Sequence, residues 1–202
     1  MKQIKIITLS LFAFALSFQS NAIGKTPADT AAYVVVKKTL IRKQGLWRAA
    51  STFSLGLMND NVRNTYIQGT LENYFDFNLS IRGDGYYFLN SVSDLKPLAK
   101  NHQLYAGLVK HWGTINWEGY AGLQPGIAIS QRTDSVLVDN ILTESQVALT
   151  PLFSPVIGLN YYTVHHFHFF LETRYSRGIH LSNSLPKYLD EIRFSFGLGF
   201  HF

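Results

Sequence analysis

The stretch IRFSFGLGFHF, residues Ile192 to Phe202, decides the fold of this chain. Its residues alternate in character with a period of two, which is the period of a β-strand. One face is small, polar or glycine, and the other is large and apolar throughout. This pattern predicts a strand with lipid on its bulky side and a crowded, polar interior on the other. The bulky face consists of Ile192, Phe194, Phe196, Leu198, Phe200 and Phe202.

A strand of alternating aromatic residues that ends in phenylalanine resembles the C-terminal signature of bacterial outer-membrane β-barrels. In that family the terminal strand is the recognition signal for the barrel assembly machinery. The resemblance implies that this machinery is a partner during biogenesis. The residues that would form the assembly signal are Phe194, Phe196, Phe200 and Phe202.

The first 22 residues have the three parts of a signal peptide. Lys2 and Lys5 precede the apolar run from Ile6 to Phe18, and Ser20-Asn21-Ala22 provides a small-x-small cleavage site. The apolar run is shorter than the roughly 20 residues of a spanning helix. We expect cleavage near Ala22, and the alternative is an N-terminal helix that is retained. Because the chain contains no cysteine, a lipoprotein anchor, disulfides and thiolate chemistry are excluded.

The basic character of the chain lies before its main body. The full sequence has a formal net charge of +5, with 18 basic and 13 acidic residues. The signal peptide and the linker-like tail at residues 23–45 hold most of the excess, and the part from Leu46 onward has 11 basic and 12 acidic residues. A nucleic-acid-binding surface needs a basic patch on the fold itself, so no nucleic-acid partner is expected. Within the tail, Tyr33 to Ile41 is either an extra strand or a segment in the barrel mouth.

The body, residues 46–202, divides into eight alternating runs. Connections are short after the second, fourth and sixth runs and mostly longer after the third, fifth and seventh, as in barrels with short periplasmic turns and long outer loops. The fold class predicted is therefore all-β: an eight-stranded antiparallel transmembrane β-barrel after a signal peptide and a short tail. The inner or outer facing of the fourth run stays open. The runs are 46–58, 65–74, 79–89, 103–111, 117–130, 154–162, 167–176 and 192–202.

Aromatic residues collect at the predicted periplasmic strand ends, where rings that are part polar and part apolar are stable at a membrane interface. We expect a girdle at that level. Its members are Trp47, Trp112, Trp117, Phe75, Phe77, Tyr162, Phe167 and Phe202.

Charged residues fall on the inward faces of the predicted strands. An eight-stranded barrel is wide enough for side chains to fill and too narrow for a broad channel. Buried charges must pair, so we expect an ion-pair network, with Asp84 and Arg174 as a mid-barrel pair. Catalysis by paired carboxylates is the less favoured reading. The network members are Arg48, Glu72, Arg82, Asp84, Glu118, Glu172, Arg174 and Arg193.

Histidines at 165, 166 and 168 suggest a metal site at first sight. In a strand only His166 and His168 share a face, whereas a closed zinc site needs four ligands. An interfacial turn rich in histidine is the favoured interpretation, and no metal or cofactor is expected.

The sequence His180-Leu181-Ser182-Asn183, with Glu191 downstream, is similar to the His-x-Ser-Asn motif of outer-membrane lipid A 3-O-deacylases. That resemblance implies His180 as general base, Ser182 as nucleophile and Glu191 as the residue that orients the histidine. Two features depart from the family: the motif falls in a predicted outer loop, and Glu191 follows the histidine sooner.

From Leu46 to Phe202 the architecture resembles small outer-membrane barrels of the OmpA/OmpX type, in the "outer membrane protein β-barrel domain" families. The resemblance implies a monomeric, non-enzymatic protein of the cell outer membrane. We expect a lumen filled with polar side chains and outer loops that meet lipopolysaccharide or external partners. The alternatives are a lipid A deacylase-like hydrolase at His180, Ser182 and Glu191, and a narrow porin-like channel.

Overall fold

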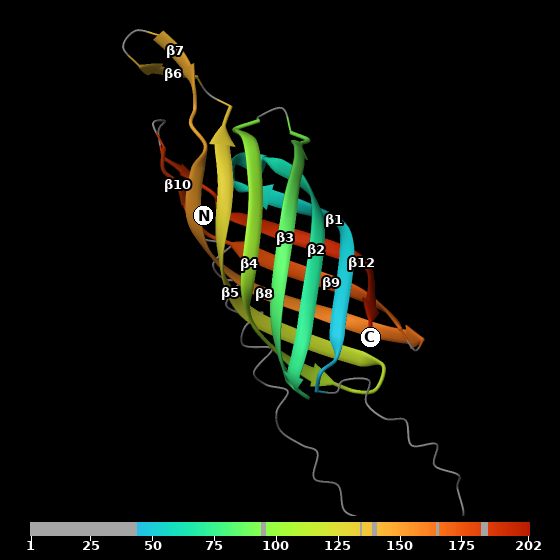
Figure 1. Ribbon diagram of the computed structural model, residues 1–202. Coiled ribbons are helices and arrows are strands. Elements are labelled where there is room, and N and C mark those ends of the chain that lie inside the picture. The colour runs from blue at the N-terminus through green and yellow to red at the C-terminus, as the bar shows by residue number, and fades with distance from the viewer. Residues whose placement is uncertain (1–43, 94–95, 134, 139–140, 165, 183–185) are drawn as a thin grey trace, which may run out of the picture. The chain divides into compact units, whose positions relative to one another are not determined.

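The computed structural model describes residues 44–93, 96–133, 135–138, 141–164, 166–182 and 186–202 (Figure 1). The predicted signal peptide and nearly all of the predicted tail lie outside these ranges. Within them, no helix is long and apolar enough to cross a membrane.

Eight strands close into one antiparallel barrel in the order β1-β12-β9-β8-β5-β4-β3-β2. The fold class predicted from alternation is confirmed. The strands are β1 (Trp47–Met58), β2 (Arg63–Asp76), β3 (Leu79–Ser91), β4 (Leu98–Gly113), β5 (Trp117–Arg132), β8 (Ala148–Val164), β9 (Phe167–Ser176) and β12 (Glu191–His201).

The first and last strands form the seam of the barrel. Arg48 pairs with His201 at one end of the seam and Met58 with Glu191 at the other. The backbone N–H of Trp47 donates to the carbonyl of Phe202 at 2.9 Å, and the reverse bond is also 2.9 Å. Closure leaves the barrel without an open edge, which is the condition for strands to lie in hydrocarbon.

Several strands extend further at the long-loop end than alternation predicted. β4 starts at Leu98 and β8 at Ala148. The loop expected at residues 131–147 contains a hairpin of β6 (Ser135–Val138) and β7 (Ile141–Glu144), and the 177–189 loop contains β10 (Ile179–His180) and β11 (Lys187–Tyr188). The extension of β4 contains Lys100, Asn101 and His102, so hydrophobic alternation does not mark it. The extension of β8 contains Pro151, a residue that argues against a strand interior.

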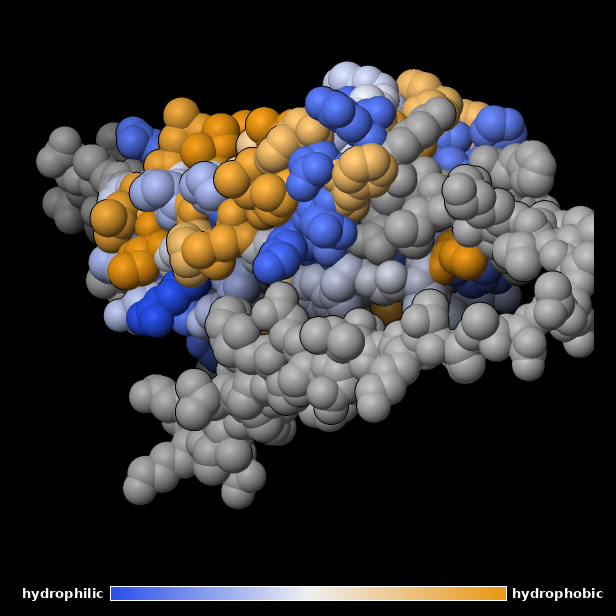
Figure 2. All heavy atoms as spheres, turned by 90° about the horizontal axis from the view of Figure 1, so that it is seen from below, coloured by the Kyte–Doolittle hydropathy of each residue, from blue (hydrophilic) through white to orange (hydrophobic). Residues whose placement is uncertain are grey.

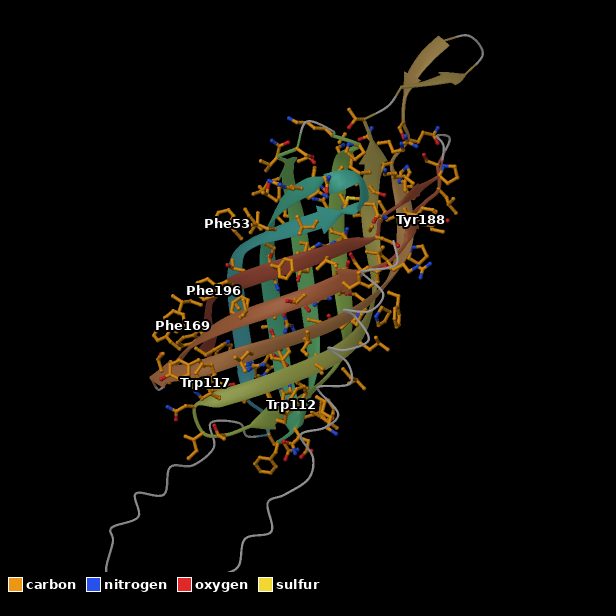
Figure 3. The ribbon with its side chains drawn as sticks, turned by 180° about the vertical axis from the view of Figure 1, so that it is seen from behind. Phe53, Trp112, Trp117, Phe169, Tyr188 and Phe196 are labelled. Carbon is orange, nitrogen blue, oxygen red and sulfur yellow. The ribbon has the colours of Figure 1, made fainter. Side chains whose placement is uncertain are left out.

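Hydrophobic side chains cover the outside of the barrel. Figure 2 shows them gathered on its surface, and Figure 3 shows Phe53, Phe169 and Phe196 pointing away from the sheet. Phe53 is 72% exposed and Phe196 is 64% exposed. Exposure of this kind over contiguous strands is not compatible with water and fits a lipid-facing band.

The expected aromatic girdle is present with one correction. Trp47, Trp112 and Trp117 are exposed at the short-turn end. Tyr162, assigned to the girdle from sequence, instead points inward and is 3% exposed. Its hydroxyl receives a hydrogen bond from Arg48 and donates one to Glu118, so the polar lumen fixes its direction.

The wall is interrupted between β8 and β9, where a side chain supplies a missing hydrogen bond. Phe153 and Arg177 exchange two backbone hydrogen bonds, and the pairing of β8 with β9 resumes at Val156. Pro155, between them, has no N–H to donate across the ladder. The hydroxyl of Ser154 donates to the carbonyl of Tyr175 at 2.8 Å instead, so this carbonyl stays paired.

Candidate functional site: the barrel interior and its outer mouth

At the short-turn end, one arginine joins two carboxylates. Arg48 Nη1 lies 2.6 Å from Glu118 Oε1, and Arg48 also pairs with Glu72. His111 sits between the same carboxylates, with Nε2 2.8 Å from Glu72 and Nδ1 3.0 Å from Glu118. All four side chains are almost fully buried, so their polar atoms are paired with one another rather than with solvent.

Halfway along the barrel, two arginines and two carboxylates alternate. Asp84 accepts from Arg82 Nη2 at 2.7 Å and from Arg174 Nη2 at 2.7 Å. Glu172 pairs with Arg82 and lies 3.7 Å from Arg174 Nε. The structure thus brings together Asp84 and Arg174, the pair suggested by strand register.

Nearer the long loops, Arg193 pairs with Glu191. Arg193 Nη2 is 2.6 Å from Glu191 Oε2. The carboxylate also accepts from the Tyr66 hydroxyl at 2.9 Å and from Asn64 Nδ2 at 2.8 Å. Glu191 is therefore a member of the lumen network.

Ion pairs and hydrogen bonds cross the full width of the barrel. In the ring of eight strands, β1 is opposite β5, β3 is opposite β9, and β12 is opposite β4. Arg48 to Glu118 spans the first pair, Arg174 to Asp84 the second, and Arg193 to Gln103 the third. These contacts connect three pairs of opposite strands across the lumen. Their side chains fill the centre of the barrel.

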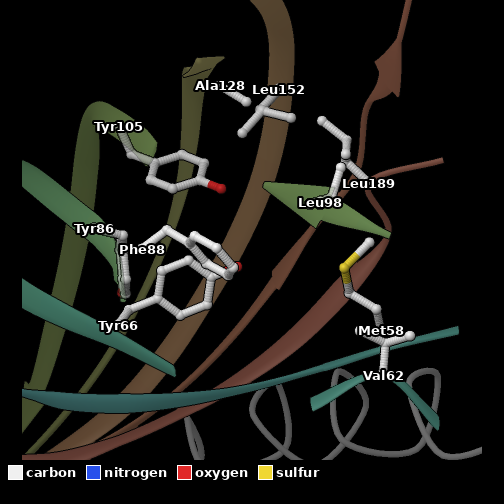
Figure 4. Close-up of a cluster of buried hydrophobic side chains, with 10 residues drawn as sticks. All are labelled: Met58, Val62, Tyr66, Tyr86, Phe88, Leu98, Tyr105, Ala128, Leu152 and Leu189. Atoms are coloured by element: carbon white, nitrogen blue, oxygen red, sulfur yellow. The ribbon is translucent and has the colours of Figure 1, made fainter. Parts of the chain in front are cut away.

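The interior is not polar throughout, contrary to the sequence-based expectation. Towards the long loops it is filled by an apolar cluster (Figure 4). Tyrosines connect this cluster to the ions: Tyr86 packs within it and donates its hydroxyl to Glu172 at 3.1 Å. The cluster fills the long-loop end of the lumen, which we call the outer mouth. Its members are Met58, Val62, Tyr66, Tyr86, Phe88, Leu98, Tyr105, Ala128, Leu152 and Leu189.

A small cavity remains in the network near the short-turn end. Its volume is about 20 Å³, which is room for one water molecule. Residues that line it include Arg48, Glu72, Arg82, Tyr120, Asn160 and His168.

The proposed hydrolytic residues are only partly assembled. His180 Nε2 is 2.9 Å from the Ser182 hydroxyl, and His180 Nδ1 is 2.8 Å from the Ser130 hydroxyl. In the described part of the chain no hydrogen bond joins His180 to Glu191, which is held in the lumen network by Arg193. Ser130 takes the position that the triad assigns to a carboxylate.

The electrostatics of His180 favour its neutral form. Burial of the imidazole lowers the pKa of His180, and the nearby Arg132 guanidinium lowers it further. A neutral imidazole can hydrogen-bond both hydroxyls, donating to one and accepting from the other. The three residues form a hydrogen-bonded unit in the outer mouth.

His166 and His168, expected on one face of a strand, point to different sides of the barrel wall. His168 points into the lumen and is 3% exposed, whereas His166 is exposed, and His165 lies outside the described residues. Among the described side chains, no cluster of three or more histidine or acidic residues has metal-binding geometry. The terminal-strand phenylalanines, Phe194, Phe196, Phe200 and Phe202, are all exposed on the outer surface.

Among the residues that form ion pairs in the described lumen, sequence reasoning missed Glu191 and His111. Extending the alternation of the last strand by one residue places Glu191 on the face of Arg193. The facing of the fourth run was undecided because Lys110 lies on the opposite face to His111. Lys110 is exposed at the short-turn end of β4, where its ammonium can reach the membrane interface.

Comparisons with known proteins agree with the fold. No protein-family model and no curated protein sequence matches the chain. The outer membrane protein OprG of Pseudomonas aeruginosa superposes with a TM-score of 0.59 at 15% identity, over 81% of this chain and 99% of that one.

Two further structures are similar. Neisserial surface protein A gives a TM-score of 0.53 at 11% identity, over 77% of this chain and 94% of that one. The N-terminal β-barrel domain of Pseudomonas aeruginosa OprF gives 0.52 at 14% identity, over 79% and 98%. The chain therefore has the fold of small bacterial outer-membrane β-barrels.

Proposed function

We propose that the protein is a non-enzymatic, monomeric barrel of the bacterial outer membrane, with a closed lumen and with outer loops that bind lipopolysaccharide or external partners. The observation that carries this proposal is the set of cross-lumen contacts between opposite strands, with hydrophobic side chains outside. Such a body anchors and presents loops but does not conduct. In biogenesis, the exposed phenylalanines of β12 would meet the assembly machinery.

A conductance measurement tests the closed lumen. Purified protein in planar lipid bilayers should show no steady single-channel current, because Arg82, Asp84, Glu172 and Arg174 fill the middle of the barrel. Insertion is checked separately by protection of the strands from added protease. A steady current from protein of native mobility would establish the porin-like alternative.

Basic residues near the ends of the barrel strands, at the long-loop end, support lipopolysaccharide as a partner, because its phosphates are anionic. The segments at this end contain as many acidic residues, three of them at 134–144, so the binding expected depends on the individual cations and not on net charge. We expect Arg63→Ala and Lys100→Ala to weaken lipopolysaccharide binding to the detergent-solubilised protein. Lys110→Ala is the matched control, since Lys110 is also exposed but lies at the short-turn end. Equal binding by all three variants would refute this part. The basic residues are Arg63, Lys96, Lys100, Arg132, Arg177 and Lys187.

Hydrolysis of lipid A is the second candidate, because His180 and Ser182 are hydrogen-bonded at 2.9 Å. Mass spectrometry of lipid A from cells with the native protein and with Ser182→Ala separates the two functions. We expect identical acylation, since no carboxylate is hydrogen-bonded to His180 among the described residues. Loss of deacylation in the variant would establish the enzyme.

A further inference from the structure

The hairpin of β6 and β7 stands beyond the rim of the barrel (Figure 1). Its two strands form a separate two-stranded sheet, and in the described residues neither strand pairs with any barrel strand. An isolated two-stranded hairpin is only marginally stable in water. The hairpin therefore differs from the barrel below it, in which every strand is paired on both sides.

Among the described residues, each strand of this hairpin pairs only with the other, so one edge of each strand is unpaired there. Val138 pairs with Ile141 and Leu137 with Leu142. Because only two residues separate Val138 from Ile141, that pair must exchange its backbone hydrogen bonds directly, and the bonding groups of the next pair point outwards. The N–H and C=O groups of Leu137 and Leu142 thus face the two free edges.

These edges lack the usual protection. Soluble proteins blunt exposed edges with charged residues, especially lysine, with proline or with bulges, and the one charged residue in these two strands is Glu144. The strand sequences SVLV and ILTE contain no lysine, proline or glycine, and five of their eight residues are valine, leucine or isoleucine. A ribbon of this composition is suited to accept another strand.

The charge of the segment selects the partner. Between Thr133 and Pro151 the acidic residues are Asp134, Asp139 and Glu144, and no lysine or arginine occurs. A second copy would bring the same negative charge against it. An extended segment with basic residues is complementary, because opposite charges favour association and like charges suppress it.

We propose that the β6–β7 hairpin binds an extended, basic segment of another protein by strand addition at the Leu137 or Leu142 edge. Backbone hydrogen bonds supply the binding, and alternate residues of the partner contact the aliphatic ribbon. The proposal rests on the proposed function, which turns this end of the barrel to the cell exterior.

The test uses the full chain in phosphatidylcholine nanodiscs and a labelled synthetic peptide of alternating lysine and valine. A peptide with proline in place of valine has the same charge and cannot add as a strand. Fluorescence anisotropy should show the lysine–valine peptide binding at least roughly tenfold more tightly than the lysine–proline peptide.

Variants locate the edge. Leu137→Pro removes an outward N–H and leaves the β6–β7 ladder intact, and Leu142→Pro does the same on the other strand. One of them should weaken binding by roughly tenfold or more, whereas Leu137→Ala, which keeps the N–H, should not. Far-ultraviolet circular dichroism verifies that each variant retains the barrel.

Three results overturn the proposal. They are equal binding of the two peptides, equal binding after replacement of residues 135–144 by a glycine–serine linker, and a concentration-dependent dimer that Leu137→Pro abolishes.

Orientation is tested apart from binding. A cysteine introduced as Ser135→Cys in this cysteine-free chain should react with an impermeant maleimide on intact cells. Failure to react would refute the proposed function and leave the peptide result standing.

Discussion

Arg174 on β9 and Asp84 on β3 meet across the barrel, with Nη2 and Oδ2 2.7 Å apart, although their strands are on opposite sides of the ring. The contact passes through the centre of the protein. Removing either partner leaves a buried charge without its counterion, which is more costly than the net value of the pair.

The first prediction concerns this pair. Arg174→Met should lower the free energy of unfolding by about 3–5 kcal/mol, because Arg82 alone then faces two carboxylates. Urea titration in detergent micelles measures the change. Adding Asp84→Leu removes one charge of each sign, so the double variant should be more stable than Arg174→Met alone; a further loss would contradict the charge argument.

The second prediction concerns the interruption at Pro155. Ser154→Ala leaves the carbonyl of Tyr175 unpaired and should cost about 1–3 kcal/mol in the same titration. Adding Pro155→Ala supplies an N–H at the ladder position and should recover part of the loss. If the double variant is no better than the single one, the hydroxyl of Ser154 has another role, such as its contact with Arg174.

The third prediction uses two glycines of the wall. A Cβ at Gly158 would lie 2.2 Å from Cζ of Tyr120, whereas a Cβ at Gly69 meets nothing within 4 Å. Gly158→Ala should therefore destabilise the barrel by about 1–3 kcal/mol through overpacking. Gly69→Ala should fall within about 0.5 kcal/mol of the native protein. Similar values for the two variants would show that Tyr120 moves aside.

The fourth prediction is a pH dependence at the outer mouth. The folded pKa of His180 is lower than its unfolded value of about 6.5. The unfolded mouth then binds the proton more tightly, so local stability is present above about pH 6.5 and falls as the pH decreases. Hydrogen exchange at Ile179 and His180, corrected for intrinsic rates, should accelerate between about pH 7 and pH 5. His180→Gln should abolish the acceleration.

Alternation predicted the barrel because lipid outside and a packed lumen inside impose the same period on every spanning strand. It also placed Asp84 and Arg174 on inward faces of strands that run in the same direction. The resemblance to lipid A deacylases assigned Glu191 to a triad, and starting the last strand at Ile192 left Glu191 out of the predicted lumen network. Tyr162 was predicted at the membrane interface, although a tyrosine is stable either there or in a polar interior. Its hydrogen bonds with Arg48 and Glu118 direct it into the lumen.

The outer mouth was beyond prediction for a different reason. Beyond the membrane, no lipid contacts the outer face of a strand. The hydrophobicity of a residue there no longer indicates whether its side chain points into the lumen or outwards. Most of the apolar cluster comes from inward faces of the barrel strands, but Val62 and Leu189 reach it from connections between strands. The contact of His180 with Ser130 joins residues 50 positions apart on elements that no periodicity relates.

The seam between β1 and β12 constrains how the molecule is made. β1 pairs with β2 on one side and with β12, the last strand, on the other. Its second edge therefore stays unpaired until β12 has been added to the sheet. An incomplete sheet in hydrocarbon would expose two rows of bare peptide groups, each costing several kcal/mol. An open sheet would therefore be costly in the bilayer until β1 and β12 pair.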